Sequence, residues 1–192
     1  MIKYFFFIFL FCVSNVYAYE RVHIAVSSNF IEPLDLIKKQ FLKKNKIIIT
    51  TSKGSTAKLF AQIINNAPID IFLSADQLTI KKLPDNKKIQ GSEFTYAIGK
   101  LVIFSKSKIL KQLKLGKFLS QKLSNKIVIG NPEFSPYGLA SKQVLESLGI
   151  WSLFKNKIIL ASNINQVSSF IYSGNVDLGF ISNSDKLKLR KY

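Results

Sequence analysis

The stretch that decides the fold is KGSTAKLFAQIINNAPIDIFLSAD, residues 53–76. A polar turn, Lys53–Thr56, opens a segment with apolar residues at helical spacing. These residues are Leu59, Phe60, Ile63 and Ile64. Asn65-Asn66 and Pro68 end the predicted helix, and Ile69–Ser74 follows as a short apolar strand. A turn, an amphipathic helix and a strand in this order predict one unit of a layered α/β fold.

The same alternation continues on both sides of this stretch. The sequence predicts strands over residues 22–27, 46–51, 69–74, 126–130, 157–160 and 176–182. Residues 94–105 form a long, extended and apolar segment. It predicts helices after Asn29, from Thr56, over 76–83, after Gly138 and over 163–172. Asn29 and Asp76 are the expected N-caps of two of these helices. Alternating strands and helices predict an α/β fold with mostly parallel sheets flanked by helices.

Composition excludes several classes of protein. The 192 residues carry 28 Lys and Arg against 11 Asp and Glu, a formal net charge of +17, yet 47% of them are hydrophobic. Such an apolar chain is predicted to fold rather than to remain a disordered polycation. One Cys and one His exclude a disulfide scaffold and a Cys/His zinc site. We expect no metal ligands and no cofactor.

The first 18 residues, MIKYFFFIFLFCVSNVYA, have the pattern of an export signal. Lys3 precedes an apolar run over Tyr4–Val13, and Ala18 is a small residue at the expected cleavage position. The run is shorter than the roughly 20 residues that a membrane-spanning helix needs. We therefore expect cleavage after Ala18 and a periplasmic protein; an uncleaved anchor or a buried core helix is the alternative.

Small polar residues lie where predicted strands pass into helices. The three junctions are Ser27-Ser28-Asn29, Gly54-Ser55-Thr56 and Ser162-Asn163. In open α/β sheets, ligands bind beyond the carboxyl ends of the strands, where helix N-termini offer free N–H groups to anions. The junctions therefore favour a small-anion site. Their alternative role is ordinary helix capping.

Five segments resemble the molybdate-binding proteins of ABC importers, a family of exported anion receptors with the type II periplasmic binding-protein fold. In order, they are AVSSNFIEPL (25–34), KGSTAKLFAQIINNAPIDIFLSADQLTIKKL (53–83), FTYAIGKLVIFS (94–105), IGNPEFSPYGLASKQVLESLG (129–149) and ASNINQVSSFIYSGNVDLGFIS (161–182). The resemblance covers residues 22–184. It implies a two-lobed fold with a first lobe over 19–98, a second over 99–178, and a return toward the first lobe over 179–192. Hinges are expected near 94–105 and 179–184.

The resemblance also implies an oxyanion site made of neutral groups. The family's ligand positions fall on Ser28, Asn29, Thr56, Tyr137 and Ile164. Tyr137 and Ile164 are expected to contribute mainly backbone N–H groups. In one branch of the family a Tyr on the last strand also faces the anion; Ser182 stands there, so that contact is absent. Family members continue beyond the position of Tyr192, so we expect a C-terminally truncated receptor with reduced stability.

The implied function is the capture of molybdate or tungstate, bound as an oxyanion, and its delivery to the membrane subunits of an ABC importer. A monomer is expected. The alternatives left open are another oxyanion such as sulfate, or a truncated remnant without ligand.

Two other classes of function are disfavoured. Nucleic-acid binding would suit the charge of +17, but the lysines are scattered over predicted helices and loops, and the chain carries an export signal. An enzyme with a Ser-His-Asp triad would have to use His23, which lies inside the first predicted strand. We expect neither nucleic-acid binding nor catalysis.

Overall fold

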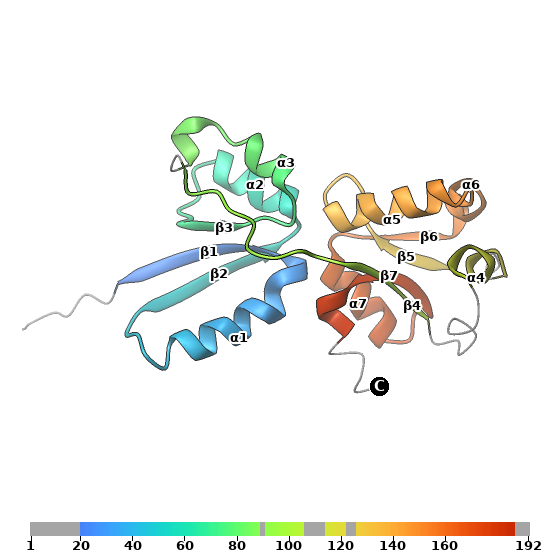
Figure 1. Cartoon of the computed structure of the whole chain (residues 1–192), viewed down its shortest axis with the longest axis horizontal. Coiled ribbons are helices and arrows are strands. Elements are labelled where there is room, and N and C mark those ends of the chain that lie inside the picture. The colour runs from blue at the N-terminus through green and yellow to red at the C-terminus, as the bar shows by residue number, and fades with distance from the viewer. Residues whose placement is uncertain (1–19, 89–90, 106–113, 122–125, 187–192) are drawn as a thin grey trace, which may run out of the picture.

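The computed structural model describes residues 20–88, 91–105, 114–121 and 126–186. The predicted signal segment, 1–18, lies outside the described residues. Within those ranges, no helix combines the length and the apolar character that crossing a membrane requires. The described elements form two bodies side by side, each built on one sheet, with the chain crossing from one to the other before β4 (Figure 1).

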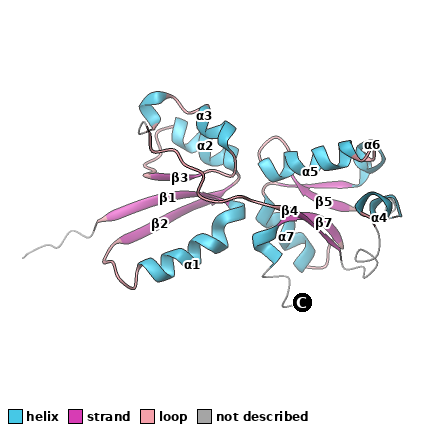
Figure 2. Cartoon of the chain, viewed as in Figure 1, coloured by secondary structure: helices cyan, strands magenta, loops and turns pink. Residues whose placement is uncertain are grey.

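The first lobe is built on a three-stranded parallel sheet of order β2-β1-β3. Its strands are β1 (Arg21–Ser27), β2 (Ile48–Gly54) and β3 (Ile71–Leu73). Its helices are α1 (Ile31–Phe41), α2 (Thr56–Ile64) and α3 (Gln77–Lys81). Helix α1 covers one face of the sheet, and α2 and α3 lie toward the other (Figure 2).

The second lobe is built on a four-stranded sheet of order β4-β7-β5-β6. Its strands are β4 (Leu101–Ser105), β5 (Ile127–Gly130), β6 (Ile158–Ala161) and β7 (Leu178–Ser182). Its helices are α4 (Leu115–Gln121), α5 (Pro136–Ser147), α6 (Trp151–Phe154) and α7 (Ile164–Tyr172). Strand β4 is antiparallel to β7, and the other pairings are parallel. The predicted α/β class, with mostly parallel sheets flanked by helices, is confirmed.

Short 3₁₀ turns connect several of these elements. They are Ser28–Phe30, Asp85–Lys87, Lys155–Lys157 and Asn183–Asp185. The turn at Ser28–Phe30 separates β1 from α1, and the one at Asn183–Asp185 follows β7. Both therefore lie next to the carboxyl ends of strands, where the predicted site is expected.

The two lobes differ in how much apolar surface they bury. All four residues of β5 are buried, and its three apolar side chains belong to two hydrophobic clusters of the second lobe. The first-lobe cluster is smaller and consists of Ile24, Val26, Ile31 and Leu34. On α1 the side chains of Leu36 and Phe41 stay exposed. Most of the described hydrophobic core therefore lies in the second lobe.

Some element boundaries differ from those predicted. Strand β2 continues through Gly54, because residues 21–27 of β1 pair with 48–54, so Lys53 and Gly54 belong to a strand and not to a turn. Within the extended segment expected over 94–105, only β4 is a strand, and it begins at Leu101, where its pairing with β7 begins. The expected boundary at residue 179 falls inside β7, whose residues all belong to the second sheet. The division into lobes at fixed residues stays a prediction.

The core of the second lobe gives a first test. Ile129 of β5 is fully buried, whereas its register partner on β6, Leu160, is 54% exposed. We expect Ile129→Ala to lower the free energy of unfolding by about 2–5 kcal/mol, because it removes buried methyl groups and leaves a cavity. The matched control Leu160→Ala is expected to lower it by less than about 1 kcal/mol. Urea denaturation of both variants checks this; equal losses would contradict the assigned core.

Candidate functional site

A small cavity lies where the carboxyl ends of five strands from the two lobes meet. The lining residues follow β1, β2 and β3 of the first lobe and β5 and β6 of the second. They are Ser27, Ser28, Asn29, Ser55, Thr56, Ala75, Ser135, Pro136, Tyr137, Asn163 and Ile164. The cavity measures about 10 Å³, close to the room that one water molecule needs. It lies at the place that open α/β sheets use for ligands.

All five residues predicted for the oxyanion site line this cavity: Ser28, Asn29, Thr56, Tyr137 and Ile164. One expectation about them is wrong. Asn29 does not cap α1, because it lies inside the 3₁₀ turn and Phe30 occupies the N-cap position without a side-chain cap. The Asn29 side chain is therefore not used by the helix that follows it.

Three hydroxyl groups of the first lobe that line the cavity already form hydrogen bonds within that lobe. Ser28 Oγ donates to the Gly54 carbonyl at 2.7 Å, which ties the end of β1 to the end of β2. Ser27 Oγ and Thr56 Oγ1 are 2.9 Å apart and buried, so one of them donates to the other. The remaining hydroxyl hydrogen of that pair can be given to a ligand.

The first turn of α5 presents one backbone donor to the cavity. Ser135 caps the helix, with its Oγ accepting from the Gly138 N–H at 3.4 Å. Pro136 has no N–H, and no described contact gives the first-turn N–H of Tyr137 a protein acceptor. Gly138 allows this arrangement, because a Cβ there would overlap the Gly130 carbonyl at the end of β5.

The first turn of α7 is organised in the same way. Asn163 is the N-cap, and its Oδ1 accepts from the Gln166 N–H at 3.1 Å. Ile164 occupies the first helical position, where the N–H has no partner within the helix. Helix N-termini carry a partial positive charge, so α5 and α7 both direct a favourable potential for anions at the cavity.

Two buried polar atoms in the cavity wall have no hydrogen-bond partner among the described residues: Asn29 Oδ1 and Ser55 Oγ. Ser55 is only 3% exposed, and although it is the N-cap of α2, its side chain makes no capping bond. A buried polar atom without a partner destabilises the folded protein by about 1–3 kcal/mol. Two such atoms in one cavity point to a ligand that would satisfy them.

The cavity wall is electrically neutral, since no Lys, Arg, Asp or Glu is among its lining residues. Burial raises the pKa of the Tyr137 phenol, a hydrogen bond from the Asn29 side chain lowers it, and the charge of Asp185 raises it. The net shift is upward, so the phenol is uncharged at neutral pH. An anion in the cavity would therefore meet neutral donors and no phenolate.

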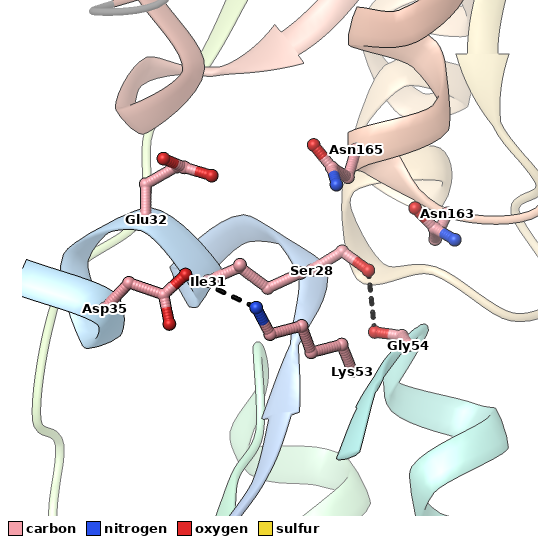
Figure 3. A pocket seen from close by; sticks show the side chains of 8 residues that line it. All are labelled: Ser28, Ile31, Glu32, Asp35, Lys53, Gly54, Asn163 and Asn165. Atoms are coloured by element: carbon pink, nitrogen blue, oxygen red, sulfur yellow. Dashed lines mark hydrogen bonds and ion pairs between the residues drawn. The ribbon is translucent and has the colours of Figure 1, made fainter. Parts of the chain in front are cut away.

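A wider and more open hollow of about 320 Å³ adjoins the cavity and shares Ser28 and Asn163 with it (Figure 3). Glu32 and Asp35 of α1 line the first-lobe side, and Asn163 and Asn165 face them from the second lobe. Lys53 Nζ is held 3.3 Å from Asp35 Oδ2. The charged groups thus lie at the mouth and not around the small cavity.

Hydrogen bonds join the two lobes next to the cavity. Ser184 Oγ donates to the Asn29 carbonyl at 2.6 Å, across 155 residues of sequence. The Ala57 N–H donates to the Phe134 carbonyl at 3.3 Å. Both contacts hold cavity-lining loops, so the relative position of the lobes fixes the geometry of the candidate site.

Other candidate chemistries find no support in the described residues. His23 Nε2 is 2.9 Å from Ser52 Oγ, but its Nδ1 faces Thr50, and Asp70 accepts from the His23 backbone N–H. No carboxylate therefore orients the His23 ring as a triad requires. The described part of the chain contains no group of three or more His, Cys, Asp or Glu that could hold a metal ion. Asp76 caps α3, as predicted, with its Oδ1 accepting from Thr79 N–H.

The predicted set omitted four polar residues that line the cavity: Ser27, Ser55, Ser135 and Asn163. All of them except Ser135 belong to the strand-to-helix junctions noted in the sequence. For Ser55, the signal was its position directly before the predicted helix start at Thr56. The sequence does not reveal that its hydroxyl makes no capping bond, because that depends on the side-chain orientation in the folded protein.

Comparison with known proteins shows the family to which the chain is similar. Residues 22–190 match the family model described as bacterial extracellular solute-binding protein. The molybdate-binding protein ModA of Azotobacter vinelandii is 38% identical over 169 residues, 88% of this chain and 67% of that protein. ModA of Rhodobacter capsulatus is 34% identical over 161 residues, 83% of this chain and 63% of that protein. The chain thus spans about two thirds of the length of these relatives.

A solved structure, the periplasmic molybdate-binding protein of Azotobacter vinelandii, superposes with a TM-score of 0.75 at 36% identity. The match covers 84% of this chain and 71% of that one. The resemblance to molybdate-binding proteins noted in the sequence is confirmed.

Tyr96, whose hydroxyl donates to the Ser74 carbonyl, is the subject of a prediction on the pH dependence of stability. Burial, and then the charge of Tyr137, raise the pKa of Tyr96 to about 12, whereas an unfolded Tyr titrates near about 10. Between these two pH values, Tyr96 is protonated in the folded protein but increasingly deprotonated in the unfolded chain. The contribution of Tyr96 to the free energy of unfolding is therefore complete below about pH 10 and is lost as the pH rises toward about 12. We expect Tyr96→Phe to show a shallower alkaline loss of stability in denaturant titrations. An unchanged slope would contradict the raised pKa.

Proposed function

We propose that this chain, which belongs to the family of bacterial extracellular solute-binding proteins, captures molybdate or tungstate as an oxyanion and delivers it to the membrane subunits of an ABC importer. Solute-binding proteins are not enzymes, in agreement with the prediction from the sequence. The relatives named as molybdate-binding proteins support the choice of ligand.

The observation that carries the proposal is the convergence of unused polar groups on one neutral cavity. Ser55 Oγ and Asn29 Oδ1 are buried without partners, and the first-turn N–H groups of Tyr137 and Ile164 end at the same cavity. A tetrahedral oxyanion presents acceptors in several directions at once. Such a ligand suits donors that come from both lobes.

Each donor can be assigned a role. The Ser55 hydroxyl, one hydroxyl of the Ser27–Thr56 pair, and the N–H groups of Tyr137 and Ile164 donate directly. Ser28 supports the site by another route, because its hydroxyl hydrogen is already given to Gly54. It fixes the loop that carries Asn29.

Asn29 can become a donor by a half-turn of its side-chain amide. The turn would place its NH₂ group where the unpartnered Oδ1 now lies. Oδ1 would then accept from the Tyr137 hydroxyl, with which the Asn29 side chain already shares a hydrogen bond. This rotation would satisfy the oxygen and add a donor for the anion.

The energetics are sufficient without a charged side chain. A hydrogen bond to a charged group contributes about 1.5–3 kcal/mol. Micromolar affinity corresponds to about 8 kcal/mol, so a handful of such bonds reaches it after the costs of association. Rigid neutral donors also select by oxyanion radius, since one size alone reaches every donor. Molybdate and tungstate are of nearly equal size and should bind alike.

The cavity of about 10 Å³ implies that the lobes must separate to admit an oxyanion. The predicted lobes are residues 19–98 and 99–178, with hinges near 94–105 and 179–184. The predicted return toward the first lobe over 179–192 runs into residues 187–192, which lie outside the described residues. The two hinge segments lie together, because the Asn183 N–H donates to the Lys100 carbonyl at 2.9 Å. A motion about this point would open the cavity as one cleft.

The remaining parts of the proposal concern location and assembly. We propose that residues 1–18 act as an export signal and that the protein works as a monomer in the periplasm, without binding nucleic acid. The relatives that support this location are extracytoplasmic solute-binding proteins.

Ligand binding is tested by calorimetry on residues 19–192 with molybdate, tungstate, sulfate and phosphate. We expect molybdate and tungstate to bind with similar affinity, and sulfate and phosphate at least tenfold more weakly, because smaller oxyanions do not reach all donors. Molybdate should also raise the melting temperature, since it binds the folded state alone. Comparable affinity for sulfate, or a melting temperature unmoved by millimolar molybdate, would refute the proposal.

Ser55→Ala separates stability from binding. Without ligand we expect the variant to be as stable as the wild type or more so, because it removes a buried hydroxyl that has no partner. Its affinity for molybdate should fall about tenfold, the equivalent of one lost bond to a charged acceptor. The matched control Ser135→Ala removes a serine that does cap its helix and should lower the melting temperature. A stability loss at Ser55 with unchanged affinity would contradict the assigned role.

A further inference from the structure

We propose that Gly99 is a positioning residue that sets how closely Tyr137 and the first turn of α5 approach the cavity. The effect on affinity rests on the proposed function, whereas the contact itself does not. Gly99 lies in the segment that crosses between the lobes, outside every strand and helix, and it is not one of the cavity-lining residues.

The space beside Gly99 is already filled by Tyr137. A Cβ on Gly99 would overlap the Tyr137 hydroxyl oxygen and would lie 3.2 Å from Cζ and 3.7 Å from Cε2. Gly99 is not among the residues with a positive φ, so its backbone would accept an alanine. Glycine is required here for room and not for conformation.

The crossing segment is held on both sides of Gly99, so it cannot easily give way. Tyr96 OH donates to the Ser74 carbonyl at 2.6 Å, and its ring meets Phe30 edge to face with centroids 4.8 Å apart. On the other side, the Lys100 carbonyl accepts from the Asn183 N–H at 2.9 Å. Gly99 is thus a fixed surface against which the Tyr137 ring rests.

Helix α5 cannot withdraw from this surface without breaking a second close contact. Gly138, the next residue after Tyr137, lies so close to the Gly130 carbonyl that a Cβ would overlap it. The first turn of α5 is therefore held between the end of β5 and the crossing segment. Because the Tyr137 N–H is the donor left free by that turn, the contact at Gly99 fixes where this donor points.

The inference implies that adding a methyl group at Gly99 displaces Tyr137, and that removing the Tyr137 hydroxyl restores the room. The test compares Gly99→Ala, Tyr137→Phe and the double variant. Gly116→Ala is the matched control, because a Cβ there meets only Leu148 at an ordinary 3.4 Å. Calorimetry with molybdate measures affinity, and thermal melting without ligand measures the contact itself.

We expect Gly99→Ala to weaken molybdate binding about tenfold in the wild-type background. In the Tyr137→Phe background the same change should weaken it less than twofold, because the remaining 3.2 Å contact with Cζ needs only a small shift. Gly116→Ala should leave affinity unchanged. A merely structural role for Gly99 would give equal losses in both backgrounds.

The outcomes separate this inference from the proposed function. If the wild type does not bind molybdate, the proposed function fails. The Gly99 contact is then judged by melting without ligand, where Gly99→Ala should lower the melting temperature in the wild-type background but not beside Tyr137→Phe. If the wild type binds molybdate and Gly99→Ala is neutral, or acts equally in both backgrounds, the positioning role is overturned.

Discussion

The constraint on which the rest of the structure depends is that several helices begin at one buried point. The first turn of any helix carries N–H groups that the helix itself cannot satisfy. Here the first turns of α5 and α7 meet the loops after β1 and β2 from the other lobe. Capping by Ser135 and Asn163 satisfies part of this need and leaves Tyr137 and Ile164 with free donors. The fold thus produces a concentration of unsatisfied donors, and an anion is the ligand that complements it.

The net charge of +17 does not explain this site, although it is the most conspicuous property of the composition. The lining of the cavity is neutral, and Lys53, at its mouth, is paired with Asp35. A lysine inside would attract any oxyanion, whatever its radius. Fixed dipoles act over short distances and in set directions, so they bind most tightly the oxyanion whose radius lets it contact all of them. No lysine lines the cavity, so in the proposed function selectivity would come from its uncharged donors.

The sequence predicted the alternation of strands and helices, because small polar residues at strand ends reveal where helices begin. The five candidate site residues came from the resemblance to molybdate-binding proteins, and all five lie in one cavity. The prediction was wrong where tertiary contacts decide. Asn is a residue type preferred at N-caps, but Asn29 lies inside a 3₁₀ turn and α1 begins at Ile31. The sequence also does not show where in the extended segment 94–105 a strand begins, because the pairing of β4 with β7 sets that point at Leu101. Ser55 looked like an ordinary cap, and its missing bond depends on a side-chain orientation that local sequence does not encode.

The unpartnered atoms connect stability to function. Ser55 Oγ, buried without a partner, lowers the stability of the ligand-free protein, and a bound oxyanion that accepts its hydrogen would remove that penalty. The first lobe has the smaller described core, so little surplus stability is available there to offset it. Contacts such as Ser184 to Asn29 and Tyr137 against Gly99 then hold the donors in place without satisfying them. Closure without ligand is thereby disfavoured and closure around an anion is favoured, which is the difference in free energy that a receptor needs in order to signal that it is loaded.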